Sequence, residues 1–142
     1  MIKKVFREKI IRMKMKEIEE SVGLVERHLP LAFKKFATMG LVKDGIYKRM
    51  EFAIQNVFDI CAIINADLNL GIPADDKEIL DNLVENKVLS SEMKEKLKLM
   101  KGFRNILVHR YGKIDDKLAF KILKDNIKDF YEFIKILKDL LK

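Results

Sequence analysis

The stretch IYKRMEFAIQNVFDICAII, residues 46–64, decides the fold of this chain. Its apolar residues recur at steps of three and four, the spacing that places side chains on one face of an α-helix. The residues of this row are Ile46, Met50, Ala53, Val57, Ile60 and Ile64. The row predicts a long helix, ended by Asn69-Leu70-Gly71-Ile72-Pro73, because glycine and proline interrupt helices.

The same spacing precedes this helix. Apolar residues from Ile11 to Leu29 form a row that predicts a long first helix, which ends before Pro30. Between the two rows, residues 30–45 show a less regular pattern, and we expect a connection there. A short helical piece can form within it, around Leu31–Thr38.

Three further helices are expected after the central one. Each follows side chains that can accept hydrogen bonds from the first N–H groups of a helix. These are Asp75 and Asp76, then Ser90 and Ser91, and then Asp115. The first helix is short and ends near Asn86, the second carries an apolar row from Met93 to Leu107, and the third carries one from Phe120 to Leu141. Gly112 is expected to separate the last two.

No segment alternates apolar and polar residues as a half-buried strand does. We therefore predict an all-α fold, an up-and-down helical bundle of four long helices plus a short one, in a single domain that spans residues 1–142. Several helices carry a second apolar row, as Phe52, Phe58 and Cys61 do in the central helix. Such a helix lies in the centre of a bundle or against another subunit, so a dimer is one of two interpretations.

Composition excludes several classes of protein. Charged residues make up 36% of the 142 residues, and the apolar runs are too short for a membrane span. The N-terminal residues lack the apolar core of a secretory signal, and a single cysteine, Cys61, is typical of a reducing, cytoplasmic location. Two histidines and one cysteine, scattered along the chain, form no metal-ligand cluster. The net charge of +7 suits nucleic acid or acidic partners, although a lysine-rich surface alone produces it too.

The stretch Arg104-Asn105-Ile106-Leu107-Val108-His109-Arg110-Tyr111 concentrates the reactive side chains. Arg104 occupies a place in the apolar row where a hydrophobic residue is expected. An arginine directed toward a core must be paired or must line a groove that an anion can reach. Our hypothesis pairs it with Asp59, which lies in a polar row with Glu51 and Gln55. The alternative is that such a pair is merely structural.

Arg104 and His109 are separated by about 140° and about 7.5 Å on an ideal helix, so they would not point to one spot. Two arrangements could still bring them together. The helix could end near His109 and let the histidine turn, or two copies could meet around a twofold axis. Alternatively, His109 could simply be a favourable cation at a helix C-terminus.

One histidine and one arginine suffice for one kind of metal-free chemistry. Cleavage of RNA by its own 2′-hydroxyl needs a base, an acid and a cation on the phosphate. Histidine can serve as base or acid near neutral pH, and the arginine fork holds phosphate. A symmetric dimer would supply two copies of His109 and two of Arg104.

Arg104-Asn105-x-x-x-His109 matches the Arg-polar-x-x-x-His signature of HEPN domains, and the following x-Tyr111 resembles their HepT toxin subgroup. Similar flanking segments extend the resemblance over roughly residues 45–135. The resemblance implies a dimeric helical bundle that acts as a metal-independent endoribonuclease toxin without a cofactor. Its usual partner is a minimal nucleotidyltransferase antitoxin.

The resemblance also assigns roles to residues. Arg104 and His109 would be catalytic, Asn105 would support them, and Tyr111 would receive AMP from the antitoxin. Asp59 is expected in a supporting role through its pairing with Arg104. Arg110, Lys101 and Lys113 flank the motif and are the candidate RNA contacts. The alternative function is a non-catalytic helical binding subunit of a nucleotidyltransferase complex.

Overall fold

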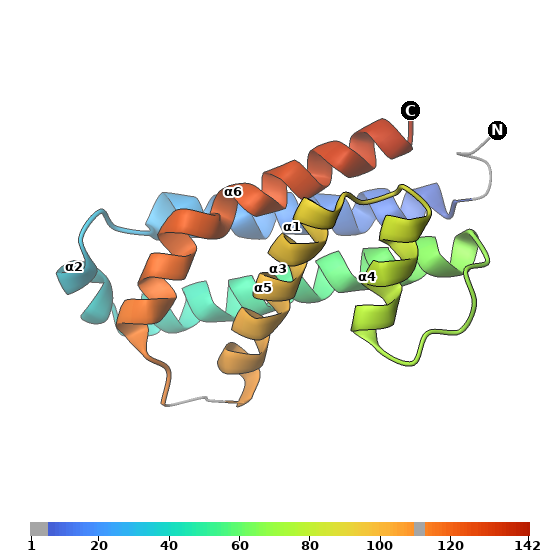
Figure 1. The fold of residues 1–142 in the computed structure, drawn as a ribbon. Helices are drawn as coiled ribbons and strands as arrows, with labels where there is room; N and C mark the ends of the chain where they lie inside the picture. The colour runs from blue at the N-terminus through green and yellow to red at the C-terminus, as the bar shows by residue number, and fades with distance from the viewer. Residues whose placement is uncertain (1–5, 110–112) are drawn as a thin grey trace.

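The computed structural model describes residues 6–109 and 113–142, and throughout these ranges the regular structure is α-helical (Figure 1). The described helices are α1 (Glu8–His28), α2 (Phe33–Ala37), α3 (Leu41–Asp67), α4 (Asp76–Glu85), α5 (Ser91–His109) and α6 (Asp116–Leu140). The predicted all-α bundle is confirmed, with α4 as its short helix and α2 as the additional helical piece. Within the described ranges, no helix combines the length and hydrophobicity that crossing a membrane requires.

Helices α1 and α3 run side by side in opposite directions and share the most extensive contact between any two helices (Figure 1). The apolar row predicted for α3 is buried at every position, and the α1 row is buried as far as Val25. Helix α6 packs against α1, whereas α4 and α5 pack against α3.

The connection expected over residues 30–45 is shorter than the sequence pattern suggested. Helix α3 begins at Leu41, directly after Gly40, whose φ of +53° lies in the left-handed region that glycine adopts most readily. The first turn of α3 exposes Leu41 and Val42 instead of burying them. The apolar row therefore starts only at Ile46, so apolar spacing alone could not show that the helix begins more than one turn earlier, at Leu41.

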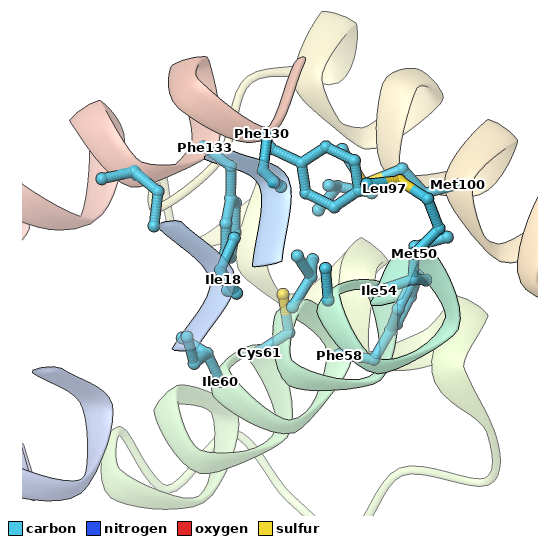
Figure 2. Packing of buried hydrophobic residues seen from close by; sticks show 14 of the residues in the cluster. Ile18, Met50, Ile54, Phe58, Ile60, Cys61, Leu97, Met100, Phe130 and Phe133 are labelled. Atoms are coloured by element: carbon cyan, nitrogen blue, oxygen red, sulfur yellow. The ribbon is translucent and has the colours of Figure 1, made fainter. Parts of the chain in front are cut away.

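The core fills the space between α1, α3, α5 and α6 (Figure 2). Most of the second apolar row of α3 faces this core, because Phe58 and Cys61 are buried within the chain itself. Phe133 of α6 is buried there too. Burial raises the pKa of the Cys61 thiol well above its ordinary value. Phe52 differs, since 43% of its surface is exposed. Interior packing thus accounts for most of these rows without a second subunit.

Side-chain caps lie at the starts of α4, α5 and α6, at the positions predicted. Asp75 accepts a hydrogen bond from the Glu78 N–H at 2.9 Å, and the Ser90 hydroxyl accepts one from the Met93 N–H at 3.0 Å. Asp115 accepts two at the start of α6. These caps fix where α5 begins and where the chain re-enters the bundle after it.

Candidate functional site

Arg104 lies on α5, half-buried, next to the core and not within it. Phe103 takes the interior position between Met100 and Leu107, so the apolar row shifts by one residue relative to the sequence interpretation. The Arg104 Nε atom is nevertheless buried and has no hydrogen-bond partner within residues 6–109 and 113–142. A buried donor without a partner is uncommon in folded proteins, so this one calls for an explanation.

The hypothesis that Arg104 pairs with Asp59 is wrong. One oxygen of Asp59 accepts a hydrogen bond from Lys14 Nζ at 3.3 Å, and the other accepts one from Gln55 Nε2 at 2.8 Å. Lys14 comes from α1, which packs closely along α3 and places its ammonium group beside this carboxylate. The sequence did indicate the row that joins Gln55 to Asp59, but it gave no sign of Lys14.

His109 is the last residue of α5, and its side chain is exposed. Because the helix continues through both positions, the ideal-helix separation of about 140° and about 7.5 Å between Arg104 and His109 applies here. One chain therefore does not direct the two side chains to a single point. His109 is also the last described residue before position 113, so the expected turn of the histidine at the helix end lies outside the described residues.

The remaining predicted residues are spread around the end of α5. Asn105 is exposed on the same helix. Lys101 Nζ lies 3.4 Å from an Asp76 carboxylate oxygen, which ties α5 to the start of α4. Lys113 is exposed and lines a groove between α5 and α6. Arg110 and Tyr111, the other two candidates, lie outside the described residues.

A cluster that sequence reasoning missed lies beside the end of α5. The Tyr47 hydroxyl donates a hydrogen bond to Asp116 Oδ1 at 2.6 Å, and Lys43 Nζ lies 2.7 Å from Asp116 Oδ2. Tyr47 and Asp116 are 69 residues apart in the sequence, and no local pattern marks them as partners. Together they join the first turns of α3 to the first turn of α6.

The electrostatics of this cluster follow from its contacts. Burial disfavours the charge on Asp116, but the hydrogen bonds from Lys43 and Tyr47 outweigh burial and lower its pKa. Burial and the hydrogen bond to Asp116 raise the pKa of Tyr47 far above its ordinary value. At neutral pH the cluster therefore contains an ionised Asp116 carboxylate and an un-ionised Tyr47 phenol.

The cluster of Tyr47, Lys43 and Asp116 forms one wall of a cleft. This cleft, about 500 Å³ in volume, lies between the first half of α3 and the end of α5. Leu107 and Val108, which directly precede His109, line it, as does Ile114. A second pocket, between α3, α5 and α6, has a volume of only about 100 Å³. Among the described residues, no group of three or more histidine, cysteine or acidic side chains could hold a metal ion.

Comparisons with known proteins agree on one family. The family model described as ribonuclease HepT-like matches residues 18–137. The mRNA nuclease HepT of Shewanella oneidensis is 27% identical over 68% of this chain and 73% of its own length. A protein of Archaeoglobus fulgidus, described only provisionally as an RNase, is 31% identical over 70% of this chain and 74% of its own length.

A solved structure shows the same fold. The tri-AMPylated HEPN toxin of Shewanella oneidensis, solved in complex with its MNT antitoxin, superposes with a TM-score of 0.82. The match covers 92% of this chain and 97% of the toxin chain, at 24% sequence identity. The bundle seen here is therefore the fold of that toxin.

Proposed function

The chain belongs to the ribonuclease HepT-like family, and on that premise we propose that it is a toxin-type endoribonuclease that cleaves RNA without a metal ion. The observation that carries the proposal is the state of Arg104. Its Nε atom is buried and lacks a partner among the described residues, while the motif partner His109 is exposed at the end of the same helix. An arginine held in this way is suited to bind a phosphate that arrives from outside.

Each motif residue has a role in the proposed reaction. His109 of one subunit removes the proton from a 2′-hydroxyl, and the oxygen attacks the adjacent phosphorus. The bond from phosphorus to the 5′-oxygen breaks, and that oxygen takes a proton from the His109 imidazolium of the other subunit. The products are a 2′,3′-cyclic phosphate and a 5′-hydroxyl. Arg104 neutralises the charge that develops on the phosphate, and Asn105 supports the site.

A homodimer completes this site. Helical geometry directs Arg104 and His109 of one chain to different places, so a shared groove needs a second copy, in which each arginine faces the other chain's histidine. Sedimentation at micromolar concentration should therefore give twice the 16.7 kDa mass of the chain. A strictly monomeric protein that cleaves RNA would contradict the shared site.

The experiment that tests the proposed reaction is cleavage of single-stranded RNA in EDTA. Wild-type protein should produce 2′,3′-cyclic phosphate ends and should spare DNA, which lacks the 2′-hydroxyl. Arg104→Ala and His109→Ala should each lower the rate by at least about 100-fold, the usual contribution of a general acid or base. Full activity in His109→Ala would end the catalytic assignment.

The chain offers matched controls. His28 is the other histidine, is exposed at the end of α1, and has its Nδ1 atom 2.9 Å from the Leu24 carbonyl oxygen. Arg12 is an exposed arginine that pairs with Glu8 within the same helix. His28→Ala and Arg12→Ala should keep the wild-type cleavage rate. This result would show that the activity depends on the two motif residues and not on histidine or arginine side chains in general.

We extend the proposal to a partner, a minimal nucleotidyltransferase that transfers AMP to Tyr111 in the cytoplasm. The support is the solved relative, a tri-AMPylated toxin in complex with its antitoxin, together with the match of Tyr111 to the subgroup pattern. With such an enzyme and ATP, wild-type protein should gain the mass of AMP and lose RNA cleavage. Tyr111→Phe should keep cleavage and lose the modification at that position. A non-catalytic binding subunit would form the complex but cleave no RNA.

A further inference from the structure

We propose that the cleft beside Tyr47 is a base-recognition subsite for one nucleotide of the RNA, with a preference for guanine. The inference rests on the proposed ribonuclease function and adds a specificity determinant to it. The first observation is position, because Leu107 and Val108 line the cleft and directly precede His109. A nucleotide that occupies the cleft would therefore lie near the end of α5 that carries His109.

Size and lining fit one nucleotide. A volume of about 500 Å³ lies within the usual range for small-molecule sites, roughly 300 to 1,000 Å³. One wall is apolar and comprises Leu107, Val108 and Ile114, which can contact the face of a flat aromatic ring. The opposite wall, from α3, carries polar and charged side chains. This combination of an apolar wall and a polar edge is typical of sites for an unstacked RNA base.

The charges favour a base over a phosphate in the cleft itself. Among the described residues, the lining contains the lysines Lys43 and Lys48 but three carboxylates, those of Asp44, Glu51 and Asp116. From these described side chains, a phosphate would meet more negative than positive charge. A neutral base that donates hydrogen bonds would instead find acceptors, because an ionised carboxylate only accepts.

Two of the three carboxylates can serve a ligand. Both oxygens of Asp116 are engaged, one by Tyr47 and one by Lys43. Glu51 uses Oε2 for its contact with Lys48 at 3.0 Å, which leaves Oε1 for another donor. Asp44 is exposed about two turns earlier on α3 and makes no ion pair with any residue in the described ranges. The cluster of Tyr47, Lys43 and Asp116 thus shapes the cleft. Glu51 and Asp44 are the carboxylates that can accept hydrogen bonds from a bound base.

Guanine is the base that best matches these acceptors. It presents two neighbouring donors, N1–H and the N2 amine, on its pairing edge. A carboxylate with both oxygens free can accept from both, as that of Asp44 can, whereas Glu51 has one oxygen for a single donor. Adenine and cytosine place a ring acceptor beside their amine, and that nitrogen would repel a carboxylate. Uracil offers a single N–H between two carbonyl oxygens. The cleft should therefore discriminate against the other three bases.

The first test is cleavage of an RNA pool with randomised sequence, followed by sequencing of the ends. Wild-type protein should enrich guanosine at one fixed position beside the cleaved bond. Glu51→Gln, combined with Asp44→Asn, should reduce this enrichment by roughly tenfold, since a bidentate base contact commonly discriminates to that degree. Glu85→Gln, an exposed acid at the end of α4 that does not line the cleft, is the matched control and should keep the wild-type pattern. Thermal unfolding of each variant verifies that it is folded.

The second test measures binding without catalysis. Guanosine 3′-monophosphate should shift the amide resonances of Val108, Ile114 and Glu51 in NMR spectra, and the adenosine, cytidine and uridine monophosphates should do so at least tenfold more weakly. Binding of this kind without RNA cleavage would keep the subsite and reject the proposed function. Cleavage with no guanosine enrichment, or an enrichment unchanged by the double substitution, would overturn the subsite and leave the ribonuclease proposal intact.

Discussion

Arg104 places a charged group at a position where the chain gains little from it structurally. Its buried Nε–H loses hydration and receives no compensating hydrogen bond from the described residues. Such a group normally lowers stability. Its presence is therefore more easily explained by a bound anion or a second subunit than by the folding of a single chain.

This explanation makes a prediction for Arg104→Met, which keeps the length and apolar contacts of the side chain. The free energy of unfolding should stay equal to that of the wild type or rise by up to about 1 kcal/mol, because an unpaired buried donor is removed. Urea denaturation of the isolated protein measures it. A loss of about 3 kcal/mol or more would instead indicate a structural ion pair, as for a buried pair that has lost one partner.

Asp116 supports a prediction about acid stability. Its pKa is lowered in the folded chain, so the unfolded chain, with a pKa of about 3.9, binds the proton first. The stabilising contribution is complete above about pH 5 and is lost as the pH falls through the folded pKa.

Asp116→Asn should therefore be less stable than the wild type at pH 7, and the difference should narrow below pH 4. Thermal unfolding between pH 3 and pH 7 measures the difference, with Asp125→Asn, an exposed position on the same helix, as control. A difference that stays constant down to pH 3 would show that the carboxylate charge contributes nothing.

At the scale of the helices, the sequence indicated the caps well and one helix start poorly. Asp75, Ser90 and Asp115 each cap the helix that they were predicted to cap, because the side chain that accepts the hydrogen bonds is itself in the local sequence. The start of α3 depends instead on the conformation of Gly40 and on a first turn that buries little, so hydrophobic spacing could not locate it.

The cap of α6 should be measurable by itself. The Asp115 carboxylate accepts hydrogen bonds from the Lys117 and Leu118 N–H groups, both at 3.1 Å. Asp115→Ala should lower the free energy of unfolding by about 1 kcal/mol, the usual cost of losing an N-cap. Urea denaturation is the measurement, and Asp125→Ala in the middle of α6 should change it by less than about 0.5 kcal/mol. Equal losses in both variants would contradict a specific capping role.

At the scale of the whole molecule, helical spacing predicted the bundle because burial follows directly from which residues share a helix face. The rows of α1, α3 and α6 pack toward one core as expected. The contacts at the candidate site were harder to predict, since they join distant helices. The pairing of Lys14 with Asp59 and of Tyr47 with Asp116 depends on how helices are set against each other, which spacing within one helix does not define.

Two phenylalanines test the core as a whole. Phe133 is fully buried between α6 and the α1–α3 pair, whereas Phe52 is 43% exposed. Phe133→Ala should lower the free energy of unfolding by about 3 to 5 kcal/mol, the usual range for a buried phenylalanine. Phe52→Ala should lower it by less than about 1 kcal/mol in the monomer. Similar losses for the two variants in urea denaturation at high protein concentration, with a small loss for Phe52→Ala on dilution, would mean that Phe52 is covered by another subunit.

The complete burial of Cys61 has a practical consequence. Its thiol is the only one in the chain, lies in the packed interior, and is held in its protonated, unreactive form. A maleimide dye should therefore leave the native chain unlabelled and should attach at a single place once an exposed residue such as Glu85 is replaced by cysteine. Energy transfer between two chains labelled at that position would report how far apart they are held while RNA is bound.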